Sequence, residues 1–87
     1  MNLSNEQWTE IRRLAPSLPS TVMTHEQDPV DSQAIFAGIL WVLRSGKSWE
    51  ALPDGYPPHQ LCKQYYTRWA RSGVFDDLLH AWVKTLN

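Results

Sequence analysis

The sequence holds little of what covalent or metal chemistry requires. Of its 87 residues, only Cys62 is a cysteine and four are glycines. A single cysteine excludes an internal disulfide framework and a zinc site built from several cysteines. So few glycines include no glycine-rich phosphate loop. His25, His59 and His80 are not spaced as metal-binding pairs, so we expect neither a metal nor another cofactor.

Long hydrophobic runs are also missing, and we expect no targeting leader. The longest apolar run, residues 39–43, is far too short to span a bilayer. The N-terminus turns polar at once after Leu3, which does not fit a signal peptide. A chain of this length suits one domain, residues 1–87. We therefore expect a cytoplasmic protein that makes no membrane contact.

The pattern that is present is helical, and no stretch alternates as a strand should. It predicts an all-α fold, a small helical bundle of four main helices plus one short helix. Ser4 and Gln7 form a capping box that begins the first helix, and Pro16 ends it near Leu14. Residues 16–28 are expected to be an irregular connection.

The second helix is predicted over residues 29–45. It is expected to be the central, buried one because its apolar residues surround about two-thirds of its circumference. These residues are Ile35, Phe36, Ile39, Leu40, Val42 and Leu43. Asp28 is the expected N-cap of this helix, Pro29 its first helical residue and Gly46 the left-handed residue after its end. Gly38, in the middle, suggests that another helix crosses closely there.

A short corner with several helix-capping and helix-terminating residues follows the central helix. Ser48 is expected to cap a short turn over residues 49–52, which Pro53 terminates before a further helix over residues 59–71. Trp49 should fill the corner and hold that helix at a steep angle, as in a helix-turn-helix. The last helix, from Val74, closes the core with an apolar stripe of Phe75, Leu78, Leu79, Trp82, Val83 and Leu86.

The helix over residues 59–71 contains no Asp or Glu, and it lies in a segment, residues 44–71, with five Lys or Arg against two acids. Cys62, Tyr66 and Trp69 should face the core. The opposite face should carry Gln60, Lys63, Gln64, Thr67, Arg68 and Arg71. The cations could bind phosphates and the three uncharged polar residues could reach base edges, so double-stranded DNA is the expected partner. An ordinary solvated helix face explains the same pattern about equally well.

Three blocks together resemble the N-terminal domain of bacterial insertion-sequence transposases. They read LSNEQWTEIRRLAP at residues 3–16, IFAGILWVLRSGKSWEALP at residues 35–53 and YYTRWARSGVFDDLLHAW at residues 65–82. The similarity covers nearly the whole chain, and the middle block is the most specific. It implies a helix-turn-helix domain that binds the terminal DNA of the element.

In that family a catalytic domain with a DDE carboxylate triad follows, whereas this sequence ends at Asn87. We therefore expect a truncated or stand-alone DNA-binding domain without enzymatic activity. The family's usual basic stretch before the central helix is here acidic, with Glu26, Asp28 and Asp31. This leaves an alternative, a protein-binding inhibitor or adaptor of a mobile element or phage that acts through this segment. A decayed gene product without function is a third possibility.

Overall fold

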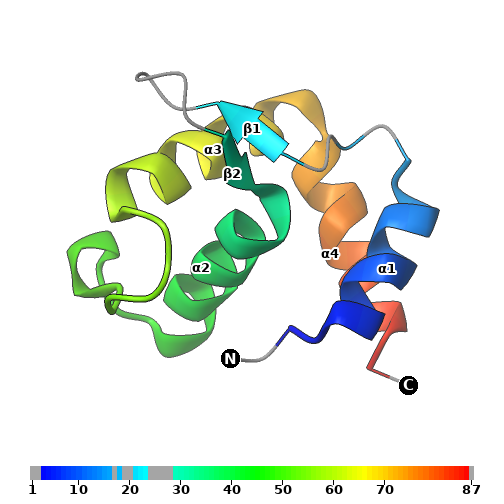
Figure 1. Cartoon of the computed structure of the whole chain (residues 1–87), viewed down its shortest axis with the longest axis horizontal. Coiled ribbons are helices and arrows are strands. Elements are labelled where there is room, and N and C mark those ends of the chain that lie inside the picture. The colour runs from blue at the N-terminus through cyan, green and yellow to red at the C-terminus, as the bar shows by residue number, and fades with distance from the viewer. Residues whose placement is uncertain (1–2, 17, 19–20, 24–28, 87) are drawn as a thin grey trace.

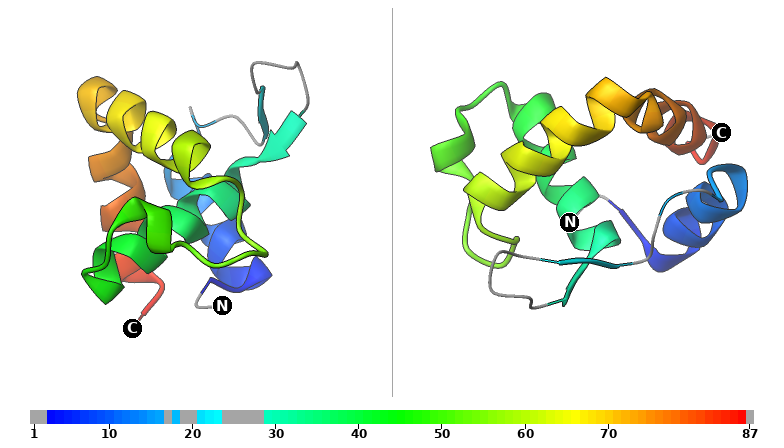
Figure 2. Two further views of the ribbon diagram at one scale, coloured as in Figure 1. Left: turned by 90° about the vertical axis from the view of Figure 1, so that its left-hand side faces the viewer. Right: turned by 90° about the horizontal axis from the view of Figure 1, so that it is seen from above.

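A computed structural model describes residues 3–16, 18, 21–23 and 29–86. Figure 1 shows the element order, and Figure 2 shows the same fold from two further sides. Helix α2 packs on α3, while α1 and α3 both pack on α4. No helix within the described ranges is long and apolar enough to cross a membrane. The elements are α1 (Asn5–Leu14), β1 (Thr21–Met23), β2 (Pro29–Asp31), α2 (Ser32–Ser45), the 3-10 turn η1 (Trp49–Ala51), α3 (His59–Ser72) and α4 (Val74–Lys84).

The mostly helical fold is thus confirmed, and so are the local signals of α1. The Gln7 N–H donates to the Ser4 hydroxyl at 3.1 Å, and the Ser4 N–H donates back to the Gln7 side chain at 3.0 Å. The helix ends at Leu14, before Pro16, as expected. Trp8 and Ile11 point into the core from this helix.

The connection between α1 and α2 differs from the prediction. Strands β1 and β2 form a two-stranded antiparallel hairpin in which Val22 pairs with Val30, and both Leu18 and Val22 are buried. Because Pro29 belongs to β2, the helix begins three residues later than expected. Asp31 is the N-cap, and its carboxylate accepts a hydrogen bond from the Gln33 N–H at 3.1 Å. The predicted cap, Asp28, lies outside the described residues.

The corner between α2 and α3 follows the prediction in outline. Gly46 ends α2 in the left-handed region at φ 70°. The short turn η1 follows, although Ser48 caps it without a side-chain hydrogen bond. The Trp49 ring lies 5.6 Å from the ring of Tyr66 on α3, measured between centroids, so this side chain does link the corner to the next helix.

Aromatic rings form a continuous series of contacts through the core. Phe36 of α2 lies 6.2 Å from both Trp8 of α1 and Phe75 of α4, and Phe75 meets Tyr66 of α3 edge-on at 5.0 Å. Together with the contact between Tyr66 and Trp49, this series of ring contacts connects all four helices and η1. Such pairs add about 0.5–1.5 kcal/mol each beyond their buried area, which matters in a domain this small.

Several apolar side chains that were expected in the core are instead exposed. Leu43 is 44% exposed, Val83 50% and Leu86 57%, because each lies in the last turn of its helix or beyond it, where the core ends. On α3, Tyr65 is buried and Tyr66 only half-buried, although Tyr66 was expected to be the inward residue.

Candidate nucleic-acid interface

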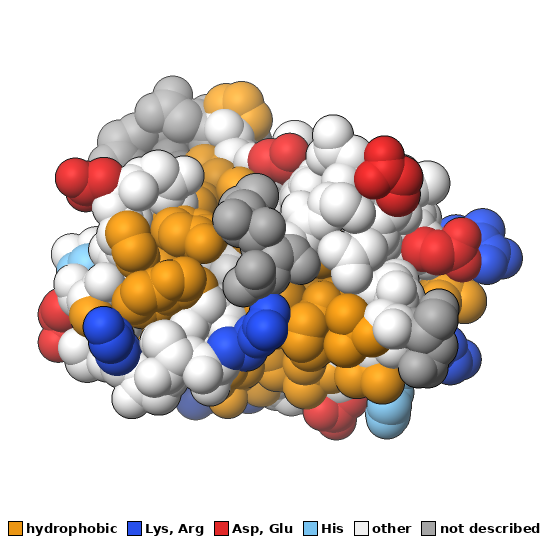
Figure 3. Space-filling view, turned by 90° about the horizontal axis from the view of Figure 1, so that it is seen from below, with side chains coloured by type: hydrophobic (Ala, Val, Ile, Leu, Met, Phe, Trp, Pro, Cys, Tyr) orange, Lys and Arg blue, Asp and Glu red, His pale blue; other side chains and the backbone are white. Residues whose placement is uncertain are grey.

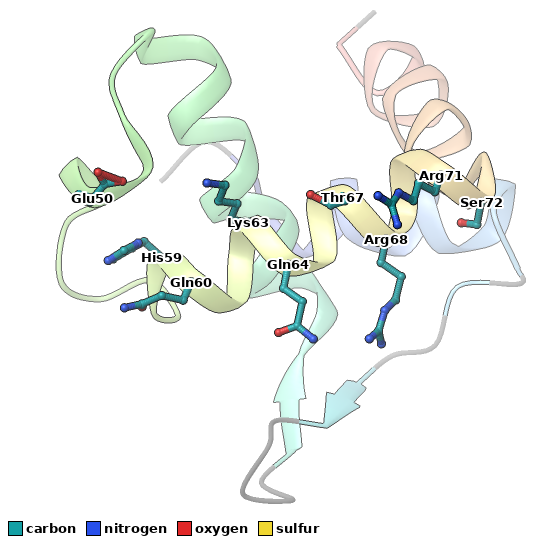
Figure 4. A pocket seen from close by; sticks show the side chains of 9 residues that line it. All are labelled: Glu50, His59, Gln60, Lys63, Gln64, Thr67, Arg68, Arg71 and Ser72. Atoms are coloured by element: carbon teal, nitrogen blue, oxygen red, sulfur yellow. The ribbon is translucent and has the colours of Figure 1, made fainter.

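The outer face of α3 gathers every residue that the sequence indicated for binding. The opposite side of the helix packs in the core through its buried residues, Leu61, Cys62, Tyr65 and Trp69. An open hollow of about 860 Å³ runs along the outer face (Figure 4). Its lining contains all six predicted residues, Gln60, Lys63, Gln64, Thr67, Arg68 and Arg71, together with Glu50, His59 and Ser72.

The side chains project in two directions from the helix. Figure 4 shows Lys63 and Arg68 on opposite edges of the face, with Gln64 on the same side as Arg68. From Lys63 to Arg71 the face extends for about 12 Å at 1.5 Å per residue. That length is comparable with the width of a DNA major groove, about 12 Å. Lys63 and Arg68 thus provide one cation at each edge of this face, which otherwise carries uncharged polar side chains such as Gln64.

Arg68 is partly pre-oriented by its neighbour Tyr65. Its guanidinium carbon lies 4.9 Å from the centre of the Tyr65 ring, and its Nη1 donates to the Tyr65 hydroxyl at 3.5 Å. Stacking on an aromatic ring leaves the other guanidinium donors free in a fixed plane. This supporting role of Tyr65 was not predicted from the sequence, although the spacing of three residues between Tyr65 and Arg68 on one helix could have indicated it.

Cations outnumber acids among the charged side chains that line the hollow. Lys63, Arg68 and Arg71 are exposed, and Glu50, contributed by η1, is the one carboxylate in the lining among the residues that the structure describes. His59 is half-buried at the start of the helix. Exposed guanidinium and ammonium groups can bind phosphate oxygens, and the amides of Gln60 and Gln64 can both donate and accept hydrogen bonds. The face can thus bind a polyanion and also discriminate among hydrogen-bonding edges.

Two contacts fix the position of α3 beneath this face. Trp49 packs on Tyr66, and Cys62 lies so close to Gly38 of α2 that a Cβ on Gly38 would come within 2.9 Å of its sulfur. Burial raises the pKa of Cys62 to about 11, so the thiol stays protonated at neutral pH. Cys62 is therefore a packing residue, as expected, because a nucleophile would need the thiolate.

The acidic segment offers less to the alternative partner. Only Asp31 of its three carboxylates lies among the described residues, and capping α2 accounts for it. Glu26, Asp28 and His25 lie outside those residues. In the part of the chain that the structure describes, no three His, Cys, Asp or Glu side chains gather in a way that could hold a metal ion.

Known proteins share this sequence pattern. A family model described as "Putative transposase of IS4/5 family (DUF4096)" matches residues 3–79. The chain is also 31% identical over 78 residues to a Sinorhizobium fredii protein named "Uncharacterized protein y4sN". That match covers 88% of this chain but 59% of the relative, so the chain spans about three fifths of the relative's length. No solved structure matches the chain.

Proposed function

The chain belongs to the IS4/5 transposase family, and on that premise we propose that it binds double-stranded DNA through the outer face of α3. In this proposal α2, the corner and α3 act as a helix-turn-helix, and α3 enters the major groove. The protein is then the DNA-binding part of a transposase system.

The observation that carries the proposal is the convergence of six donor side chains on one open, nearly acid-free face. Lys63 and Arg68, at opposite edges, are suited to phosphates on the two sides of a groove. Gln60, Gln64 and Thr67 lie between or beside them and can reach base edges. Arg71 adds a third cation near the C-terminal end of the helix.

Helix α4 is a poorer candidate for the same role. Its first turn carries Asp76 and Asp77, both exposed. Carboxylates at that position would approach the phosphates and repel them. The difference in charge between α3 and α4 therefore favours α3 as the recognition helix.

Fluorescence anisotropy with labelled duplexes tests the proposal. With three cations contributing, log affinity is expected to fall linearly with log salt, with a slope of about −3, so that affinity drops roughly 60-fold between 50 and 200 mM salt. Replacing both Arg68 and Arg71 by alanine is expected to reduce the slope to about −1 and to weaken binding to all duplexes alike. Gln64→Ala is expected chiefly to reduce the preference for the element's terminal sequence over a random duplex.

A matched control comes from α1. Arg13 is exposed and paired with Glu10, a contact that lowers the pKa of Glu10. Arg13→Ala removes the same charge as Arg71→Ala but away from the proposed interface, so it is expected to leave DNA affinity within about twofold. Equal effects of the two substitutions, or no binding to any duplex at low salt, would contradict the proposal.

A further inference from the structure

A second exposed surface lies where the C-terminal ends of α2 and α4 approach each other: the guanidinium carbon of Arg44, next to Leu43 in α2, lies 5.6 Å from the centre of the Trp82 ring in α4. We call it the apolar face and define it by Leu43, Leu79, Trp82, Val83 and Leu86. Leu43, Val83 and Leu86 are each between 44% and 57% exposed, and Leu79 and Trp82 are half-buried. Figure 3 views the molecule from the side that contains these two helix ends and shows hydrophobic side chains in two areas, with Lys or Arg side chains between and beside them. Exposed apolar residues that cluster in this way mark interaction sites more often than isolated ones do.

The apolar residues of α4 divide into two sets with different surroundings. Phe75, Leu78 and Ala81 are buried against the rest of the chain. Leu79 and Val83 lie four residues apart on one side of the helix, and Leu86 follows in the turn directly after its end. Apolar residues with this spacing are suited to packing against another helix.

Charge along α4 indicates how a partner helix would lie. Asp76 and Asp77 occupy the first turn, and Lys84 occupies the last. Two copies of α4 packed antiparallel would bring the acidic end of one against the basic end of the other, twice in a symmetric pair. A parallel pair would place like charges together. The helix is therefore complementary to itself in one orientation only.

We propose that the apolar face binds a second copy of this chain, with the two α4 helices antiparallel about a two-fold axis. Such an interface is isologous, because each copy contributes the same residues. None of its residues lines the hollow on α3, so the pairing leaves the DNA-binding face open. Five partly exposed side chains cannot supply the ~800 Å² per partner of a standard interface, so we expect a dimer that dissociates in the micromolar range.

Sedimentation velocity of the whole chain, from low micromolar to sub-millimolar concentration, tests this proposal. The wild type is expected to shift from monomer to dimer over that range. Val83→Asp combined with Leu86→Asp is expected to raise the dissociation constant at least about tenfold. Leu14→Asp is the matched control because Leu14 is 40% exposed but lies at the end of α1, and it is expected to change the constant less than about twofold.

A charge swap tests the orientation. Lys84→Asp places acids at both ends of α4 and is expected to weaken the dimer at least about tenfold at low salt. Adding Asp76→Lys and Asp77→Lys restores opposite charges and is expected to recover the wild-type constant within about threefold. Circular dichroism of each variant checks that the helices remain. A chain that stays monomeric throughout, a control as damaging as the double substitution, or a swap that fails to restore pairing would overturn the proposal.

Discussion

Gly38 and Cys62 provide a direct test of how closely α2 and α3 pack. A Cβ added to Gly38 would lie 2.9 Å from the Cys62 sulfur, which is closer than real atoms of this kind approach. The next neighbours, Leu52 Cδ2 at 3.5 Å and Tyr56 Cδ1 at 3.7 Å, are at ordinary contact distance. Gly38→Ala should therefore be opposed by one atom, the Cys62 sulfur.

The expected energies follow from two opposing effects. Alanine in place of glycine in a helix interior stabilises by about 1 kcal/mol, whereas overpacking a tight core costs about 1–3 kcal/mol. Cys62 is fully buried and has little room to move. Gly38→Ala alone should thus cost about 0–2 kcal/mol, and in a Cys62→Ala background, where the sulfur is absent, it should stabilise by up to about 1 kcal/mol.

The wild type, the two single variants and the double variant form a double-mutant cycle. Urea unfolding of these four proteins, followed by circular dichroism, gives the coupling energy between Gly38→Ala and Cys62→Ala. We expect a coupling of about 1–3 kcal/mol. Gly46→Ala is a useful control, because its cost arises from φ 70° and nothing lies within 4 Å of the added atom, so it should not couple to Cys62. A coupling between Gly38 and Cys62 below about 0.5 kcal/mol would refute the close contact of the two helices.

Three other experiments test the fold. Ile39→Ala should cost about 2–5 kcal/mol because Ile39 is fully buried, whereas Leu43→Ala should cost less than about 1 kcal/mol; urea titrations compare them. Asp31→Ala should lower stability by about 1 kcal/mol through loss of the N-cap of α2, and thermal unfolding measures it. Cys62 has a folded pKa raised to about 11 from an ordinary 9.0, so its contribution is intact below pH 9 and is lost as pH rises toward 11. Over that window the wild type should lose up to about 1.4 kcal/mol per pH unit more than Cys62→Ala, which paired denaturation curves would reveal.

Features that depend on neighbours in the sequence could be predicted from the sequence alone. The capping box of Ser4 and Gln7 and the left-handed Gly46 are determined within one helical turn, and the structure contains both. The location of Lys63 and Arg68 on one outer face likewise follows from helical spacing and from the lack of Asp and Glu in residues 59–71.

Features that depend on residues distant in the sequence could not be predicted in this way. Two aspartates three residues apart could each cap α2, and pairing of β2 with β1 decides in favour of Asp31. These strands are three residues long, which is too short for alternation to be visible. Helical periodicity identified the apolar side of α2 and α4 but not the point at which the core ends, and so Leu43 and Val83 were wrongly expected inside.

Gly73 both ends α3 and begins α4, with φ 85° and no other residue between the helices. A residue inserted there would lengthen this one-residue connection and change the position and rotation of α4 relative to α3. Phe75 and Leu78 would then leave the core. We therefore expect natural length variation among relatives to be excluded at this junction and to accumulate instead between α2 and α3, where 13 residues connect the helices.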